Sequence, residues 1–166
     1  ALARTSHDAE RRYLERRLAS LLAERDALAA AAGGAPKPLW VKIAPDLSDA
    51  ELDEVLAALT AAGVDGVIAT NTTLARDGLG DPQRAESGGL SGRPLRARST
   101  AIVAAIHRRA GGALPIIGVG GVATADDVRE KLDAGAAVVQ LYTGLVYGGP
   151  GLPGRLLRAL AAQAWA

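Results

Sequence analysis

The sequence contains no cysteine and no methionine, and it carries little net charge. Without cysteine there is no disulfide framework, no thiolate metal site and no cysteine nucleophile. The 19 basic residues nearly balance the 18 acidic ones, so a net charge of +1 gives no electrostatic reason to expect nucleic acid or an anionic membrane surface as a partner. No apolar run approaches the roughly 20 residues that span a bilayer, and no signal segment opens the chain. We therefore expect this chain by itself to be soluble.

The residues that are present have the balance of a globular protein. Of 166 residues, 49% are hydrophobic and 22% are charged. This length allows one domain with a sizeable core, and no repeat, charge block or long linker divides it, so we expect one structural unit over residues 1–166. The chain begins at Ala1, as expected for a piece of a longer protein.

Hydrophobic periodicity predicts a leading helix at about residues 8–32 and four β/α units over about 38–164. Capping boxes, Ser48 with Glu51 and Thr124 with Asp127, predict the starts of two helices. Residues 71–93 form a polar stretch of about 20 residues without periodicity, a length that is usually functional or disordered. The predicted strands are Leu39–Ala44, Gly66–Thr70, Leu114–Val119 and Ala137–Leu141, and two further helices run from about Leu95 to Ala110 and from about Leu152 to Ala164.

Short strands that are apolar on both faces and alternate with helices predict a parallel sheet covered by helices, an α/β fold. A complete (β/α)₈ barrel, the TIM barrel, takes about 250 residues, so this chain supplies half of its strands and one leading helix. An open doubly wound sheet is the competing architecture.

Polar residues and glycines recur where the predicted strands end. In order along the chain these are Lys42, then Thr70-Asn71-Thr72, then Gly118–Gly121, then Tyr142-Thr143-Gly144. In a barrel the C-terminal ends of the strands carry the chemistry. We therefore expect these four groups to meet at one edge of the sheet.

Each group has a functional and a structural interpretation. The glycines of Gly120-Gly121 and of Tyr142–Gly144 either bring backbone N–H groups close to a phosphate or only make tight turns. Lys42, embedded in an apolar strand, either extends to water or stands beside a cofactor that becomes anionic on reduction. Asn71 and Thr72 either cap the loop or bind a planar polar ligand. Histidines and helical arginines are interpreted as solvated surface residues, and no metal site is predicted.

Five motifs follow one another from about Pro38 to Leu160. They are V-K-I-A-P-D at Val41–Asp46, I-A-T-N-T-T at Ile68–Thr73, G-G-L-S-G-R-P-L at Gly88–Leu95, P-I-I-G-V-G-G at Pro115–Gly121 and Q-L-Y-T-G at Gln140–Gly144. In their order and spacing these motifs resemble those of the dihydroorotate dehydrogenases. The N-T-T and S-G-R-P-L forms favour the quinone-linked class, class 2.

The resemblance implies the C-terminal half, roughly the last four β/α units, of an FMN enzyme that oxidises dihydroorotate to orotate in pyrimidine (UMP) synthesis. It further implies quinone as electron acceptor, a missing N-terminal half of the barrel as partner, and a peripheral place on the cytoplasmic side of the inner membrane for the full-length enzyme. The family's pattern assigns FMN contacts to Lys42, Thr70, Gly92, Gly121, Tyr142 and Thr143. It assigns the pyrimidine to Asn71 and Thr72.

The catalytic base is where the chain departs from the family's pattern. That base is a serine in an N-V-S-S-P-N-T-P-G type segment, whereas Ser6 here follows Ala-Leu-Ala-Arg-Thr and matches none of it. No catalytic residue is assigned, and we expect the chain to be inactive alone. The alternatives are another FMN- or phosphate-binding barrel oxidoreductase and a non-catalytic half-barrel.

Overall fold

The structure is a computed structural model that describes residues 2–80 and 82–164. The protein consists of two compact units, whereas the sequence predicted one structural unit. The N-terminal unit reaches to Val41 and adds Leu47–Gly66, and the sheet unit comprises Lys42–Asp46 with the chain from Val67 onward.

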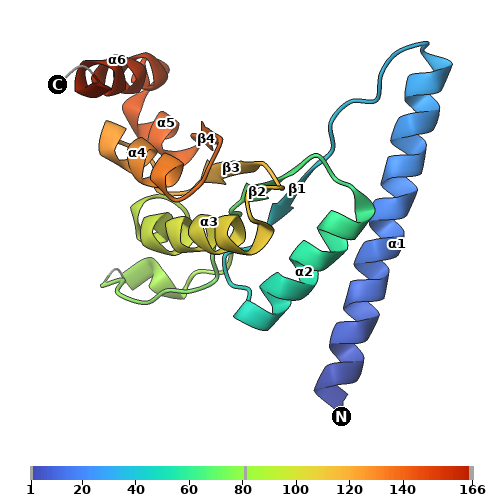
Figure 1. Cartoon of the computed structure of the whole chain (residues 1–166). Coiled ribbons are helices and arrows are strands. Elements are labelled where there is room, and N and C mark those ends of the chain that lie inside the picture. Colours follow the sequence, from blue (N-terminus) through green and yellow to red (C-terminus); the bar gives the residue numbers. More distant parts are fainter. Residues whose placement is uncertain (1, 81, 165–166) are drawn as a thin grey trace. The chain divides into compact units, whose positions relative to one another are not determined.

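Two helices, α1 (Leu2–Ala31) and α2 (Asp49–Ala62), pack against each other in the N-terminal unit (Figure 1). Helix α2 begins as predicted, because the Ser48 side chain accepts from the Glu51 N–H while the Glu51 carboxylate accepts from the Ser48 N–H. Helix α1 starts six residues before the predicted position, and the side chain of Ser6 lies outside the described residues.

Four short strands form one sheet in the order β1-β2-β3-β4, which is also their order along the chain. Strands β2, β3 and β4 pair in parallel, with Val67 opposite Ile116 and Ile117 opposite Val138. The strand order has no point of reversal, which a doubly wound sheet requires, so the sheet is wound as in a barrel. The strands are β1 (Trp40–Ile43), β2 (Gly66–Ala69), β3 (Ile116–Val119) and β4 (Val138–Gln140).

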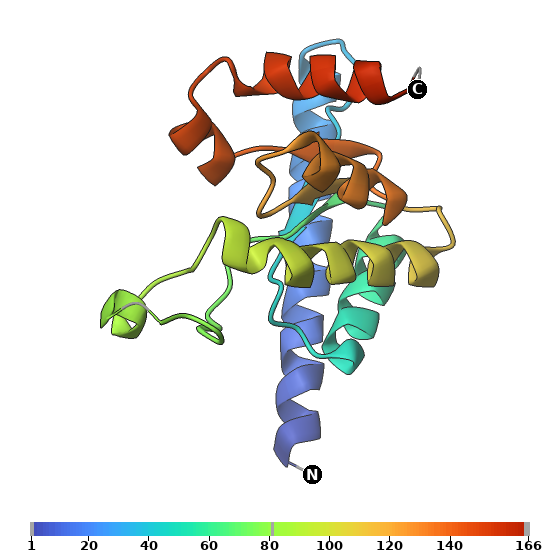
Figure 2. The same cartoon turned by 90° about the vertical axis from the view of Figure 1, so that its left-hand side faces the viewer.

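Helices follow the strands of the sheet unit. Helices α3 and α4 lie next to each other in both views, and α6 packs on α4 (Figures 1 and 2). The elements are the 3₁₀ helices η1 (Pro82–Ala85) and η2 (Arg93–Leu95), and the α-helices α3 (Arg96–Ala110), α4 (Ala125–Asp133), α5 (Thr143–Gly148) and α6 (Leu152–Ala164).

Two sequence predictions about β4 and its surroundings were wrong. Strand β4 is not apolar and buried on both faces, since Val138 is 54% exposed and Gln140 is exposed. The physical reason is that β4 is the last strand in the sheet order, and among residues 2–80 and 82–164 only β3 pairs with it. Residues 143–148, where the sequence predicted no helix, form α5, whose glycines give it a low intrinsic helix propensity.

Lys131 is the one lysine whose side chain is fully buried among the described residues, and sequence analysis did not single it out. Its Nζ donates to the Arg96 carbonyl oxygen at 3.1 Å and to the Thr100 hydroxyl, so it ties α4 to α3. Burial, only partly opposed by the nearby Glu130 carboxylate, lowers the pKa of Lys131 from 10.5 to about 8.

This lowered pKa makes stability depend on pH in a defined window. Between about pH 8 and pH 10.5 the folded state has lost the Lys131 proton and the unfolded state keeps it, so stability rises with pH. Relative to a Lys131→Met variant, we expect the wild-type free energy of unfolding to increase by on the order of 3 kcal/mol across this window. Denaturant titrations of both proteins at several pH values measure this change in the free energy of unfolding. The same substitution at the exposed Lys37 is the control, and a pH-independent difference for Lys131→Met would contradict the prediction.

The turn after β3 and the start of α5 touch backbone to backbone. A Cβ atom on Gly144 would overlap the carbonyl oxygen of Val122, so only glycine allows this approach. The contact joins the ends of β3 and β4, which carry two of the predicted site segments. Beside it, Val122, Val128, Leu152 and Leu156 form a buried apolar cluster that holds α4 and α6 together.

We expect Gly144→Ala to destabilise the protein, by roughly 1–3 kcal/mol, because the added methyl group forces the two turns apart. Gly154→Ala is the matched control, since a Cβ there meets only the Arg158 guanidinium at 3.5 Å inside helix α6. That control should stabilise the protein by about 0.5–1 kcal/mol through helix propensity. Equal effects of the two substitutions on the midpoint of denaturant unfolding would rule out the tight contact.

Candidate functional site

A cavity of about 260 Å³ opens at the C-terminal edge of the sheet, within the sheet unit. Every strand contributes to it: β1 through Lys42, β2 through the residues after Ala69, β3 through its glycine turn and β4 through Gln140 and beyond. The segment before α3 closes one side with Ser91, Gly92 and Leu95. The predicted meeting of strand ends at one edge is therefore confirmed.

All eight residues predicted to contact a ligand line this single cavity. They are Lys42, Thr70, Asn71, Thr72, Gly92, Gly121, Tyr142 and Thr143. Sequence reasoning missed Ser91, whose hydroxyl accepts a hydrogen bond from the Thr143 hydroxyl at 2.9 Å. That bond links the loop before α3 to the start of α5, a contact between segments 52 residues apart that no local pattern signals.

Lys42 reaches out of its apolar strand with its ammonium group, as the sequence predicted. Its side chain is exposed, whereas the next residue of β1, Ile43, is buried. The reason is the alternation of faces along a strand, which turns Lys42 toward the cavity. Within residues 2–80 and 82–164 its ammonium has no hydrogen-bond or ion-pair partner, so it is available to an anionic ligand.

The segment after β2 uses its own side chains to hold its shape. Thr70 is buried and donates to the Asn71 carbonyl at 2.9 Å, while the Asn71 side-chain oxygen accepts from the Thr72 N–H at 2.9 Å. The Asn71 side-chain oxygen therefore caps the loop locally, which is one of the two roles considered from the sequence. Its NH₂ group has no protein acceptor among the described residues and lies in the cavity lining.

The long polar loop of residues 71–93 is organised by hydrogen bonds at both of its ends. The Asp46 carboxylate accepts from the Thr73 hydroxyl and, at 2.8 Å, from the Leu74 N–H. Thr73 also exchanges backbone hydrogen bonds with Leu90, at 2.8 and 3.0 Å. The Arg76 guanidinium donates to the Gly88 carbonyl at 2.6 Å and closes the loop on itself. This order brings Thr72 and Gly92 to the same cavity.

The two glycine turns present backbone donors without protein acceptors. Among the described residues, the N–H groups of Gly120, Gly121, Thr143 and Gly144 make no hydrogen bond to the protein, and all four residues line the cavity. Unpaired N–H groups of this kind are strong donors that need a partner in water or a ligand. Their convergence from two turns favours an anion over a purely structural role of the glycines.

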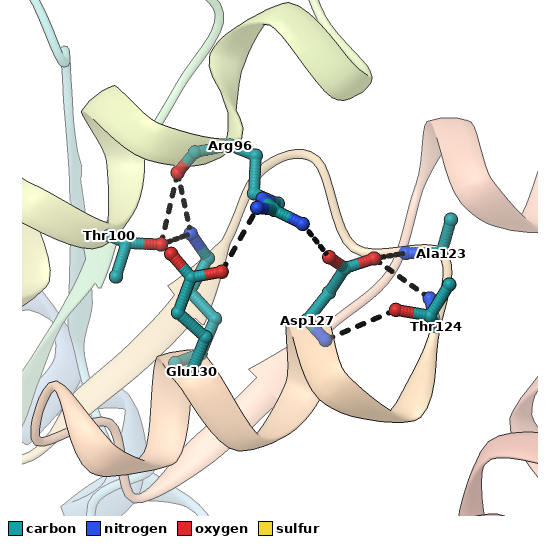
Figure 3. A network of polar contacts seen from close by, with 7 residues as sticks. Arg96, Thr100, Ala123, Thr124, Asp127 and Glu130 are labelled. Atoms are coloured by element: carbon teal, nitrogen blue, oxygen red, sulfur yellow. Dashed lines mark hydrogen bonds and ion pairs between the residues drawn. The ribbon is translucent and has the colours of Figure 1, made fainter.

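The N-terminus of α4, in contrast, is already occupied. The Asp127 carboxylate accepts from the N–H groups of Ala123 at 3.0 Å and Thr124 at 2.9 Å (Figure 3). Arg96 donates to the same carboxylate at 2.5 Å from the start of α3. Burial raises the pKa of Asp127, but the hydrogen bonds from Ala123, Thr124 and Arg96 outweigh it and hold this pKa below its ordinary value.

Arg96 is exposed, as predicted for a helical arginine, with 49% of its side chain accessible, but it also pairs with the buried Asp127. Besides Asp127 it pairs with Glu130, with its Nε 3.4 Å from that carboxylate, and the bond to Asp127 and the two negative charges raise the pKa of Arg96. The predicted capping box of Thr124 and Asp127 is confirmed. The ion pair with Arg96 went unnoticed because 31 residues separate the partners.

Residues 2–80 and 82–164 contain no cluster of histidine, aspartate and glutamate side chains suited to a metal ion. No helix among them has the length and apolar character needed to cross a membrane.

Curated proteins with similar sequences align with most of this chain. The dihydroorotate dehydrogenase (quinone) of Chromobacterium violaceum is 53% identical over 146 residues, 87% of this chain and 42% of the relative. The protein of the same name from Salinispora arenicola is 56% identical over 86% of this chain and 41% of the relative. The chain thus spans about two fifths of the length of these relatives.

Solved structures give the same result. The crystal structure of DHODH from Eimeria tenella in complex with ferulenol superposes with a TM-score of 0.73 at 40% identity, over 79% of this chain and 36% of that one. The ligand-free form from the same organism gives 0.71 at 41% identity. The four parallel β/α units are those of a TIM barrel, and a family model for dihydroorotate dehydrogenase matches residues 6–163. This chain belongs to the dihydroorotate dehydrogenase family.

Proposed function

We propose that this chain provides the FMN-holding part of a quinone-dependent dihydroorotate dehydrogenase, which oxidises dihydroorotate to orotate in UMP synthesis. The observation that carries the proposal is the convergence of eight residues of the family's motifs on one cavity. The names of the relatives, which specify quinone, support the electron acceptor. A quinone acceptor in turn supports a peripheral place for the full-length enzyme on the cytoplasmic side of the inner membrane.

The residues around the cavity fit FMN. The four unpaired N–H groups of Gly120, Gly121, Thr143 and Gly144 suit a phosphate group, which accepts several hydrogen bonds at once. Gly92 lies opposite Thr143, where a Cβ atom would come within 3.2 Å of the Thr143 methyl group, so its backbone approaches the cavity without a side chain. We assign the phosphate to the two turns, with Gly92, Thr70 and Tyr142 lining the rest of the flavin site.

Lys42, Asn71 and Thr72 are assigned to the reacting end of the cavity. FMN, when bound, accepts a hydride from the substrate carbon. The Lys42 ammonium places a positive charge in the cavity lining, where it stabilises negative charge that develops on reduction. The free NH₂ group of Asn71 and the hydroxyl of Thr72 are suited to the polar edge of a pyrimidine.

Lys42→Ala should lower the reduction potential of FMN bound to the protein, because a positive charge near the reduced cofactor is lost. The shift should be on the order of tens of millivolts, since Lys42 is exposed and water screens its charge. Spectroelectrochemical titration of the FMN-loaded protein measures it, with Lys37→Ala as a control outside the cavity. An unchanged potential in the Lys42 variant would leave this lysine a structural residue.

The protein of residues 1–166 alone should not turn over dihydroorotate. Proton removal beside the transferred hydride needs a positioned base, which typically contributes about 10²–10⁴-fold, and no residue here matches the family's serine segment. The assay is dye reduction with added FMN and dihydroorotate, and addition of the barrel's N-terminal half should restore activity. Robust turnover without that half would place the base within this chain and overturn the prediction.

A further inference from the structure

The turn that carries the unpaired N–H groups of Gly120 and Gly121 is fixed at its far end by one carboxylate. Asp127 binds the N–H groups of both Ala123 and Thr124, the residues that lead from this turn into α4. The carboxylate is 6% exposed and is held in turn by the Arg96 guanidinium. The position of the turn therefore depends on a side chain that does not line the cavity.

Arg96 also contacts the near end of the same turn, through its backbone. A Cβ atom added to Gly121 would lie 2.6 Å from the Arg96 Cα and 2.8 Å from its nitrogen. Gly121 itself has a φ of +72°, which side chains rarely adopt. The segment from Gly120 to Thr124 is thus held against the first residue of α3 by its backbone and by the Arg96–Asp127 ion pair.

The ion pair also has an electrostatic consequence for an anion in the cavity. A buried carboxylate next to the glycine turn would repel a phosphate group, and the low local dielectric would strengthen that repulsion. The Arg96 guanidinium neutralises the carboxylate where it stands. Both effects, the fixed backbone and the balanced charge, act on the phosphate end of the cavity.

We propose that Arg96 and Asp127 are positioning residues for phosphate binding: they hold the Gly120–Thr124 backbone so that the N–H groups of Gly120 and Gly121 face the FMN phosphate. The inference rests on the proposed function. The simpler alternative is that the pair only joins α3 to α4. The two alternatives predict different effects on flavin affinity. If the ion pair only joined the helices, its loss would weaken FMN and riboflavin binding equally. If it positions the phosphate-binding backbone, its loss weakens FMN binding and leaves riboflavin binding unchanged, because riboflavin has no phosphate.

The chain offers a matched control for this comparison. Glu130 lies on the same helix as Asp127 and pairs with the same arginine, but it binds none of the amides of the turn. Asp127→Asn and Glu130→Gln each remove one negative charge with little change in shape. Arg96→Gln removes the guanidinium charge, and Arg96→Lys restores a positive charge as the conservative rescue.

Fluorescence titrations give the dissociation constants of FMN and riboflavin for each variant of the full chain. We expect Arg96→Gln, which leaves the Asp127 charge unopposed, to weaken FMN binding by about tenfold or more. Asp127→Asn loosens the turn but also removes the repelling charge, so it should weaken FMN binding by a smaller factor, about threefold or more. Neither variant should change riboflavin binding by more than about twofold. Arg96→Lys should recover part of the FMN affinity, and Glu130→Gln should leave both flavins near the wild-type values. Equal weakening of FMN and riboflavin in the Asp127 and Arg96 variants would overturn the inference.

A second measurement needs no flavin. Amide hydrogen exchange of Ala123 and Thr124, followed by NMR in the flavin-free chain, should accelerate in Asp127→Asn and not in Glu130→Gln. If the wild type prefers FMN over riboflavin and Asp127→Asn keeps that preference, the phosphate site stands and the positioning role is refuted. If the wild type binds the two flavins equally, the phosphate site of the proposed function is refuted, and the positioning role with it.

Discussion

The close approach of backbones around the turn after β3 is the constraint on which the candidate site depends. On one side Gly121 meets the backbone of Arg96 at the start of α3, and on the other Gly144 meets the carbonyl of Val122. Side chains at these positions would separate the segments. Because the turns touch directly, the N–H groups that they leave unpaired converge on one cavity instead of pointing into separate loops.

A network of charged side chains next to the Gly120–Thr124 turn connects α3 to α4. Asp127 is neutralised by Arg96, Arg96 is shared with Glu130, and the buried Lys131 is bound by the Arg96 carbonyl and the Thr100 hydroxyl. A buried charge is tolerated only when it is paired or hydrogen-bonded, and the two buried members, Asp127 and Lys131, meet that condition. Helix α4 is therefore held to α3 by polar contacts, whereas it is held to α6 by the apolar cluster.

Two lysines lie in surroundings opposite to those that their sequence neighbours suggest. Lys42, flanked by apolar residues in β1, is exposed at the cavity, whereas Lys131, on a helix rich in charged residues, is fully buried. The surroundings of a side chain in space, and not its neighbours in the chain, set its burial. Only the first of the two is suited to act on a ligand, because the second already has its partners within the protein.

The sequence by itself determined the features that depend on interactions within a few residues. The two capping boxes, the strand positions and the polar ends of the strands were all readable, because each rests on local hydrogen bonding or on short periodicity. The resemblance of five motifs to one family also named eight of the residues that line the cavity. What only the tertiary structure decided were contacts over 31 to 52 residues of separation: Arg96 with Asp127, Lys131 with Thr100, and Ser91 with Thr143. Such pairs leave no periodic trace in one sequence, because their spacing is set by how the strands and helices pack.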